Sequence, residues 1–284
     1  LTDADFNVAV GVGSLFNDHK GNKSTAIGHN TLAIQDFTTS TDTFNTAVGF
    51  QAGNAVTTGV RQTLIGGLAG DALTTGDNNT AVGYNSLSAM TVGDRNVAVG
   101  VGTLASANVT SNADTYNTAV GFDAGNDITT GTSNTLIGGL AGDAQTTASN
   151  NTAVGYASLG TNTTGAGNVA VGRESLFNNT TASNNTAVGL NSLYTNTTGA
   201  NNVAVGKDAL IASTTANNNT AVGYDCLQAN TTGASNVAVG KSALEANTVG
   251  AKNVALGMDA LGTNIDGSRS VAVGDSALAA QEPA

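Results

Sequence analysis

The side chains that most often carry chemistry in proteins are few in this chain and lie far apart. His19 and His29 are the only two histidines, and Cys226 is the only cysteine, at a position where other repeats of the chain carry Ser or Ala. A metal site needs several His, Cys or carboxylate ligands at short spacing, and a catalytic triad needs a histidine beside its nucleophile. We therefore expect surface histidines, a small buried cysteine, and no catalytic residue, cofactor or metal.

Two short segments, residues 42–44 and 114–116, carry residue types that suit recognition. Each places an aromatic ring beside an acid and a hydroxyl, an arrangement that can stack on a sugar or dock on a partner. Loops on a rigid scaffold are frequent recognition sites. The alternative is that both rings pack back against the body of the protein. The candidate partner-contact residues are Asp42, Thr43, Phe44, Asp114, Thr115 and Tyr116.

Both segments interrupt a repeat that runs through almost the whole chain. Variants of the motif Asn-Thr/Val-Ala-Val-Gly occur sixteen times, and thirteen of the fifteen intervals between the motif glycines keep one 17-residue spacing, the other two having a 21-residue spacing. The motif glycines are Gly11, Gly28, Gly49, Gly66, Gly83, Gly100, Gly121, Gly138, Gly155, Gly172, Gly189, Gly206, Gly223, Gly240, Gly257 and Gly274. A fixed short period indicates one supersecondary unit stacked on itself.

Each position of the repeat, counted from its asparagine, has a characteristic residue type. Position 1 is Asn in thirteen copies, position 3 is Ala in fourteen, position 4 is Val, Ile or Leu, position 5 is always Gly, and position 9 is Leu in twelve. Residues 151–167 and 185–201 are representative turns. Their structural residues are Asn151, Val154, Gly155, Leu159, Asn185, Val188, Gly189 and Leu193. We expect Asn162, Asn196 and Asn230, which begin Asn-x-Thr triplets, to be turn residues, or glycan acceptors in a glycosylating pathway.

The pattern predicts an all-β fold, a parallel β-roll or β-solenoid of sixteen turns of about 17 residues each. Positions 1–4 and 6–9 each resemble a short strand, with Gly, Asn and Thr between them. Helix is excluded because the apolar spacing does not follow a 3.6-residue period. Equivalent residues of successive turns then lie about 4.8 Å apart, so that the asparagines form amide ladders inside the body. We expect one Val and one Leu of each turn to face the interior.

The repeat covers residues 1–284 without a composition break, which predicts a single continuous solenoid. Residues 1–154 contain two four-residue loop insertions within a 72-residue super-repeat, in which the sequence TLIGGLAGDA occurs at 63–72 and again at 135–144. Residues 155–284 keep the strict 17-residue period. The insertions are expected to project as two larger loops.

Charge and composition restrict the classes of partner. The net charge is −11, from 20 acidic and 9 basic residues, which disfavours nucleic acid and anionic lipid surfaces. There is no 18-residue apolar stretch, so no membrane insertion is expected in this segment. One Val and one Leu buried per turn contribute about 3–6 kcal/mol before the ordering of the chain is counted. This small interior favours an obligate oligomer that buries outer apolar rows as well.

The units NTAVGYNSL, NTAVGYASL and NVAVGKSAL resemble the head repeats of trimeric autotransporter adhesins. They are more similar still to the 17-residue repeats of bacteriophage tail-fibre proteins, and the resemblance extends from Asn7 to Leu278. It implies a left-handed β-roll assembled as a homotrimeric fibre, located extracellularly on a virion or a bacterial cell surface. It also implies a host-surface receptor or glycan as the partner.

The function indicated by these features is a structural and adhesive fibre, a rigid trimeric rod that presents loops or a tip for attachment, with the virion fibre favoured over the bacterial adhesin. Two other functions remain open. An ice-binding solenoid would use the recurring threonines as a hydroxyl ladder. A polysaccharide-degrading, tailspike-like solenoid would need grouped carboxylates, and the acids of this chain are spread over separate turns.

Overall fold

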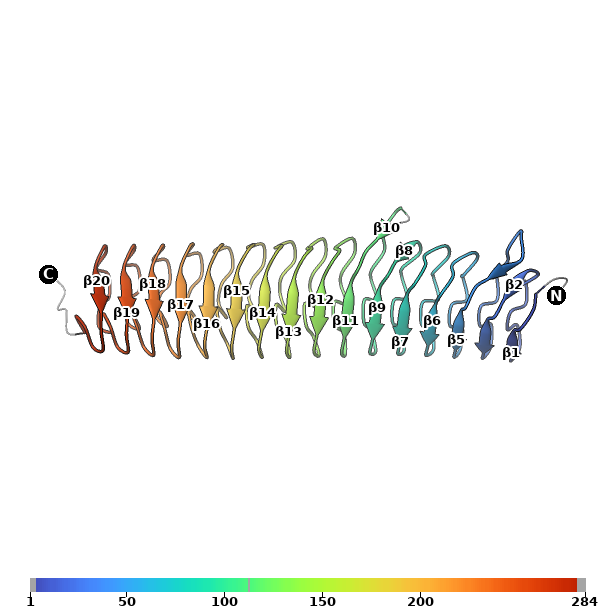
Figure 1. Ribbon diagram of the computed structural model, residues 1–284, viewed down its shortest axis with the longest axis horizontal. Helices are drawn as coiled ribbons and strands as arrows, with labels where there is room; N and C mark the ends of the chain where they lie inside the picture. Colours follow the sequence, from blue (N-terminus) through green and yellow to red (C-terminus); the bar gives the residue numbers. More distant parts are fainter. Residues whose placement is uncertain (1–3, 112, 280–284) are drawn as a thin grey trace. The chain divides into compact units, whose positions relative to one another are not determined.

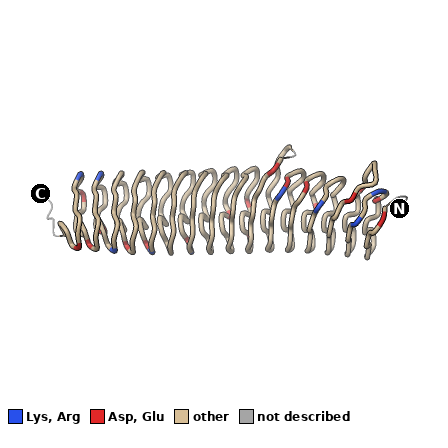
Figure 2. The backbone as a smooth tube through the Cα atoms, in the orientation of Figure 1, with Lys and Arg blue, Asp and Glu red and all other residues tan. Residues whose placement is uncertain are grey.

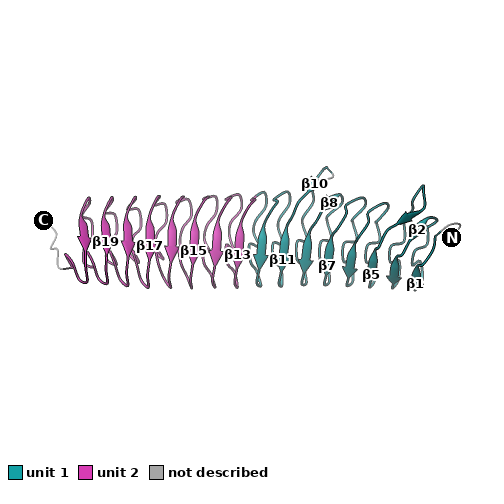
Figure 3. Cartoon of the chain, viewed as in Figure 1, with its two compact units in different colours: residues 1–147 teal, residues 148–284 magenta. Residues whose placement is uncertain are grey.

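The computed structural model describes residues 4–111 and 113–279, and these residues are all-β with no helix. The prediction of a helix-free, parallel β-solenoid of about sixteen turns is therefore confirmed. The chain divides into two compact units, unit 1 (Leu1–Thr147) and unit 2 (Ala148–Ala284), which Figure 3 shows in different colours. Each unit contributes eight three-residue strands, one per turn.

The strands of each unit follow one another in chain order (Figure 1). The main strands of unit 1 are β1 (Val8–Val10), β3 (Thr25–Ile27), β5 (Thr46–Val48), β6 (Thr63–Ile65), β7 (Thr80–Val82), β9 (Val97–Val99), β11 (Thr118–Val120) and β12 (Thr135–Ile137). Unit 1 also has four two-residue strands, β2 (Gly21–Asn22), β4 (Thr41–Asp42), β8 (Gly93–Asp94) and β10 (Ala113–Asp114). The strands of unit 2 are β13 (Thr152–Val154), β14 (Val169–Val171), β15 (Thr186–Val188), β16 (Val203–Val205), β17 (Thr220–Val222), β18 (Val237–Val239), β19 (Val254–Leu256) and β20 (Val271–Val273).

Within each unit the strands pair in parallel and in register with the repeat. Thr152 pairs with Val169 and Ala153 with Ala170, so each position of one turn meets the same position of the next. Backbone hydrogen bonds extend this register around the coil, as in Leu159 N–H to the Ser175 carbonyl. Equivalent positions stack because a shift of one residue would turn every side chain of the strand to the opposite face.

The prediction of two strands per repeat is wrong, because positions 6–9 form a turn. The backbone at position 7 and at position 9 is left-handed: φ is +52° at Ala157 and +56° at Leu159. A β-strand needs negative φ at every residue. Here two left-handed residues have a single residue between them, and together they bend the chain sharply inward. The turn places the leucine side chain in the interior, where Leu159 and Leu193 are fully buried.

The prediction that one valine of each turn faces the interior is also wrong. The alanine between the two outer strand residues is the buried one, as at Ala153 and Ala187, while Val154 and Val188 are half-buried on the outer face. Successive side chains of a strand point to opposite faces. Burial of position 3 therefore turns positions 2 and 4 outward, and the small alanine leaves room for the leucine of position 9.

The asparagines at position 1 form the predicted ladder inside the body. Asn151 and Asn185 are buried, and each side-chain oxygen accepts the backbone N–H of the asparagine one turn on, at 2.8 Å from Asn168 to Asn151. The side-chain nitrogen donates across its own turn, from Asn151 to the Gly165 carbonyl at 2.9 Å. The ladder therefore satisfies backbone groups more than other side chains, which is what buried polar groups require.

A second asparagine ladder lies at position 12 in unit 2. Asn162, Asn196 and Asn230 lie outside the strands, as expected of turn residues, but they are fully buried, so the alternative that they are glycan acceptors is wrong. Asn179 donates to the Asn162 side-chain oxygen at 2.9 Å and to the Ala182 carbonyl at 3.0 Å. The Thr-Thr turn that follows is exposed at its second threonine, but the asparagine before it points into the core.

The invariant glycine of position 5 is required by a close approach of successive turns. At Gly155 φ is +134°, a conformation that L-residues rarely adopt, and a Cβ there would lie 2.6 Å from the Gly172 carbonyl oxygen. Any side chain would force the turns apart. The sixteenfold repetition of this glycine thus follows from the stacking distance itself.

Candidate interaction surfaces

The two insertions of unit 1 have the same backbone arrangement. In the first, β4 pairs in parallel with β2, and in the second β10 pairs with β8. The partners in both short pairs are offset by 20 in the sequence (Gly21 with Thr41, Gly93 with Ala113), whereas those in the main strands that follow are offset by 21. Each insertion therefore adds three residues before its short strand and one after it. Figure 1 shows β10 projecting beyond the neighbouring turns.

The single extra residue after each short strand is a buried threonine. Thr43 donates to the Asn22 carbonyl at 2.9 Å, and Thr115 donates to the Asp94 carbonyl at 2.8 Å. Both side chains are fully buried. Thr43 and Thr115 are therefore not accessible to a partner. They fasten the insertions to the coil.

The other four candidate residues form two equivalent clusters on the surface. Phe44 and Tyr116 have exposed fractions of 54% and 52%, so the rings do not pack back into the coil. The carboxylate of Asp42 pairs with Lys23 at 2.5 Å, and that ammonium lies 5.1 Å from the centroid of the Phe44 ring.

In the second cluster, Arg95 forms an ion pair with Asp114, and its guanidinium lies 5.5 Å from the centroid of the Tyr116 ring. The Tyr116 hydroxyl also donates to the Asp114 carboxylate at 3.0 Å. Each cluster thus combines an aromatic ring, a carboxylate and a cation in a fixed arrangement, which suits recognition of a polar partner with a flat apolar side.

The residues that sequence reasoning missed are the two cations and two apolar anchors. Lys23 and Arg95 were visible as basic residues one position before the motif asparagine or its serine substitute, and the 72-residue super-repeat separates them just as it separates the insertions. Phe37 and Val109 lie at the start of the two insertions and are buried, with exposed fractions of 9% and 8%. The common phase of these residues in the super-repeat is the signal that would have found them.

Each unit also exposes a row of side chains on the outer face of its main sheet, which is apolar in every turn at position 4 but alternates at position 6 of unit 2 with Arg173, Lys207, Lys241 and Asp275. The row combines the aliphatic residue of position 4 with the residue of position 6, which is often aromatic. Its exposed members in unit 1 include Ile27, Phe50, Ile65, Tyr84, Val101, Phe122 and Ile137. Those in unit 2 include Tyr156, Leu190, Tyr224, Val239, Leu256 and Met258. The charged residues coloured in Figure 2 lie outside the three-residue strands of both units. Exposed apolar patches of this extent typically mark interaction surfaces.

The histidines and the cysteine lie where the sequence predicts. His19 is exposed and contacts Asp36, and the exposed His29 stacks on Phe50 with ring centroids 5.5 Å apart. Cys226 is fully buried, its Sγ lies 3.2 Å from the Ala238 carbonyl oxygen, and burial raises the pKa of its thiol to about 12. A thiol held neutral in this way is inert. Within residues 4–111 and 113–279, no three His, Cys, Asp or Glu side chains gather as metal ligands would.

The part of the chain that the structure describes has no helix long and apolar enough to span a membrane. Comparison with known proteins assigns no family: no protein-family model matches the chain, and no curated protein matches it.

Proposed function

We propose that this protein is a structural and adhesive fibre, in which three copies of a left-handed β-roll associate along their outer apolar rows and present the insertions of unit 1 for attachment. The observation that carries the proposal is the row of exposed aliphatic and aromatic residues at positions 4 and 6. In a monomer these side chains are exposed to water. Association of identical rows would bury them turn by turn.

The small interior supports the same conclusion. Away from the ends, each turn buries an alanine or leucine at position 3, a small residue at position 8, a leucine or glycine at position 9, and an amide, hydroxyl or apolar side chain at position 12. An interior of this kind gains little hydrophobic stabilisation per ordered residue. Oligomers with a regular repeat can recover it, because an interface that matches in one turn matches in all turns of the unit.

The resemblance to tail-fibre and adhesin-head repeats supports an extracellular location, on a virion in preference to a bacterial cell, and a receptor or glycan on a host surface as the partner. The clusters around Phe44 and Tyr116 are the proposed contact points. Nothing in the grouping of acidic residues favours catalysis.

The mass of the protein in native solution tests the assembly. A trimer is expected, with three times the chain mass of 27.8 kDa. Replacing Val188 with Lys would place a charge in the outer row and is expected to lower the trimer fraction. The matched control is Thr164→Lys, on the exposed Thr-Thr turn, which should leave the mass unchanged. A monomer in the unmodified protein would contradict the proposal.

A second candidate function is ice binding, because one further surface row is rich in threonine. Successive turns of unit 2 expose Thr164, Thr181, Thr198, Thr215 and Thr232 at position 14. The threonine before each of these donates its hydroxyl to the backbone of the next turn, as Thr163 does to the Thr180 carbonyl. A single row of exposed hydroxyls remains. Thermal hysteresis of the purified protein would support this function, and its absence would exclude it.

A further inference from the structure

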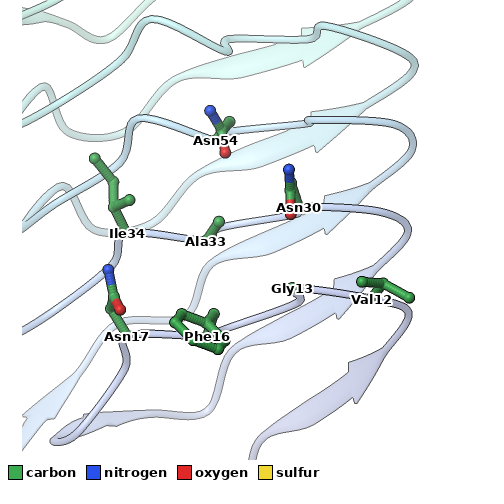
Figure 4. A pocket seen from close by; sticks show the side chains of 8 residues that line it. All are labelled: Val12, Gly13, Phe16, Asn17, Asn30, Ala33, Ile34 and Asn54. Atoms are coloured by element: carbon green, nitrogen blue, oxygen red, sulfur yellow. The ribbon is translucent and has the colours of Figure 1, made fainter.

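A shallow cavity lies on the side of the first three turns of unit 1. It has a volume of about 450 Å³, which is within the range of small-molecule sites. Figure 4 shows Phe16 and Ala33 near its centre, Asn17 and Ile34 on one side, and Asn30 on the other, with Asn54 on the next turn.

In the cavity an aromatic ring has no aromatic neighbour on the next turn. Phe16 occupies position 10 of its turn, and the same position carries Ala33 and then Asn54 on the two turns that follow. The Phe16 side chain has an exposed fraction of 78%. Its ring is therefore open to a ligand.

The same position in unit 2 shows what closes such a site. Phe177 and Tyr194 stack there with ring centroids 5.5 Å apart and an interplanar angle of 12°. The Phe177 ring also covers Gly160 of the preceding turn, where a Cβ would lie 2.8 Å from it. Both faces of the Phe177 ring therefore have a protein partner, Gly160 on one side and Tyr194 on the other.

Three side-chain amides line the same cavity as the open ring. Backbone hydrogen bonds fix their positions: Asn17 N–H donates to the Ala33 carbonyl at 3.1 Å, Asn30 N–H to the Val12 carbonyl at 2.8 Å, and Asn54 N–H to the Gln51 carbonyl at 3.1 Å. Within residues 4–111 and 113–279, none of the three side chains has a hydrogen-bond partner in the protein. Each amide offers two donors and an acceptor.

We propose that this cavity binds one ring of a neutral saccharide. The Phe16 ring would stack on the apolar C–H face of the sugar, and the amides of Asn17, Asn30 and Asn54 would exchange hydrogen bonds with its hydroxyls. No charged side chain lines the cavity, which favours a neutral sugar over an acidic or an amino sugar. Ile34 contributes an apolar wall.

This inference rests on the proposed attachment function only for its biological meaning, because that function includes a glycan among the proposed partners. It concerns residues other than the insertion clusters. Sugar binding can be measured on the free protein without any host, so the two proposals can fail separately.

The test is ligand-observed NMR with neutral methyl glycosides of glucose, galactose, mannose and N-acetylglucosamine, with N-acetylneuraminic acid as the charged comparison. At least one neutral glycoside should show saturation transfer, and Phe16→Ala should weaken its binding by about tenfold or more, the loss expected for one stacked ring. Phe16→Trp should retain binding. The matched control is Phe177→Ala, which removes the equivalent ring of unit 2 and should leave sugar binding unchanged.

Four outcomes would overturn the inference. None of the neutral glycosides binds, or Phe16→Ala binds as well as the unmodified protein, or the acidic sugar binds better than every neutral one. A change in native mass on Phe16→Ala would instead assign the cavity to a contact between copies of this chain, and would also overturn it. Because Phe16 is largely exposed, its removal is expected to leave the thermal unfolding midpoint unchanged, which confirms that a loss of binding is local.

Discussion

Unit 1 and unit 2 differ most at position 12, where each turn sends a side chain into the core. In unit 2 six of these residues are asparagine, interrupted once by Ser213. In unit 1 most of them are apolar: Val56, Leu73, Met90, Ala107 and Ile128. Two stretches of the same repeat thus fill the same layer, one with an amide ladder and the other with hydrocarbon.

A second exchange accompanies the first. Leu64 and Leu136 replace the alanine of position 3 in unit 1, and glycine replaces the leucine of position 9 both on their own turns (Gly70, Gly142) and on the turns before them (Gly53, Gly125). A Cβ at Gly53 would lie 2.6 Å from a methyl group of Leu64, and one at Gly125 would lie 2.7 Å from a methyl group of Leu136. The leucine has moved from one wall of the core to the other.

The comparison shows what the coil requires and what it leaves free. Both units keep the same parallel register and the same glycine at position 5. Backbone bonds between turns define the fold, and the interior needs only a constant volume with no unpaired polar group. An amide ladder and a layer of apolar side chains both meet that requirement, provided that neighbouring turns carry the same kind of side chain at that position.

The largest expected effect comes from breaking the exchange in unit 1. Leu64→Ala should destabilise the protein by about 2–5 kcal/mol, because it leaves a cavity between two glycines. Gly53→Leu alone should also destabilise it, since the new side chain would collide with Leu64. Urea unfolding of the two single variants and the double variant completes a double-mutant cycle. The double variant should recover much of the loss, and strictly additive losses would refute the exchange.

The next largest effect comes from breaking the ladder of unit 2. Asn179→Leu should cost about 2–4 kcal/mol, because buried groups left unpaired cost about 1–3 kcal/mol each: the Asn162 oxygen loses its donor and one N–H of the Asn196 side chain loses its acceptor. The matched control is Leu73→Met at the same position of unit 1, expected to cost less than about 1.5 kcal/mol. Equal urea midpoints for the two variants would mean that the asparagine ladder of unit 2 does not contribute to the stability of the protein.

A smaller gain is expected where the ladder is already interrupted. The side-chain oxygens of Asn196 and Ser213 are buried and have no hydrogen-bond partner. Ser213→Asn would supply the missing amide and should stabilise the protein by about 1 kcal/mol, the typical net value of one hydrogen bond. The expected readout is a higher thermal midpoint together with slower amide exchange in turns 196–230. Ser192→Asn, at the non-ladder position 8, serves as the control and should not stabilise.

The smallest effect concerns pH and unit 1. Burial raises the pKa of four aspartates, all of which lie in that unit: Asp18, Asp71, Asp94 and Asp143. A raised pKa means that the folded state holds the proton more tightly than the unfolded state. These carboxyls therefore lower the stability as the pH rises above the ordinary value of 3.8 and through their raised values.

The double variant Asp71→Asn with Asp143→Asn tests this dependence. It should raise the urea midpoint near neutral pH and have a smaller effect near the ordinary aspartate pKa of 3.8. The control is Asp266→Asn on an exposed turn of unit 2. A gain that does not change with pH would mean that burial of the two carboxyls is not its cause.

Much of the fold could be predicted from periodicity. The positions of the turns, their parallel stacking, the buried leucine, the first asparagine ladder and the inert cysteine all follow from residue types that recur at one spacing. The inward direction of Ala153 and the outward direction of Val154 could not be predicted, because a strand of three residues is too short for hydrophobic alternation to be read. For the candidate site, the aromatic and acidic residues of the insertions were found, but burial of Thr43 and Thr115 was not.

The sequence by itself determined the number of residues in each turn. Equivalent residues must stack on one another in successive turns, so the same residue types recur along the chain at an interval of one turn. What only the tertiary structure decided is the direction of each side chain. A left-handed backbone at Leu159 turns a predicted second strand into a corner, and that corner sends Asn162 inward and leaves Thr164 outside. The reason is physical: backbone dihedrals at two residues reorient everything that follows them in the turn, and residue type alone does not specify those dihedrals.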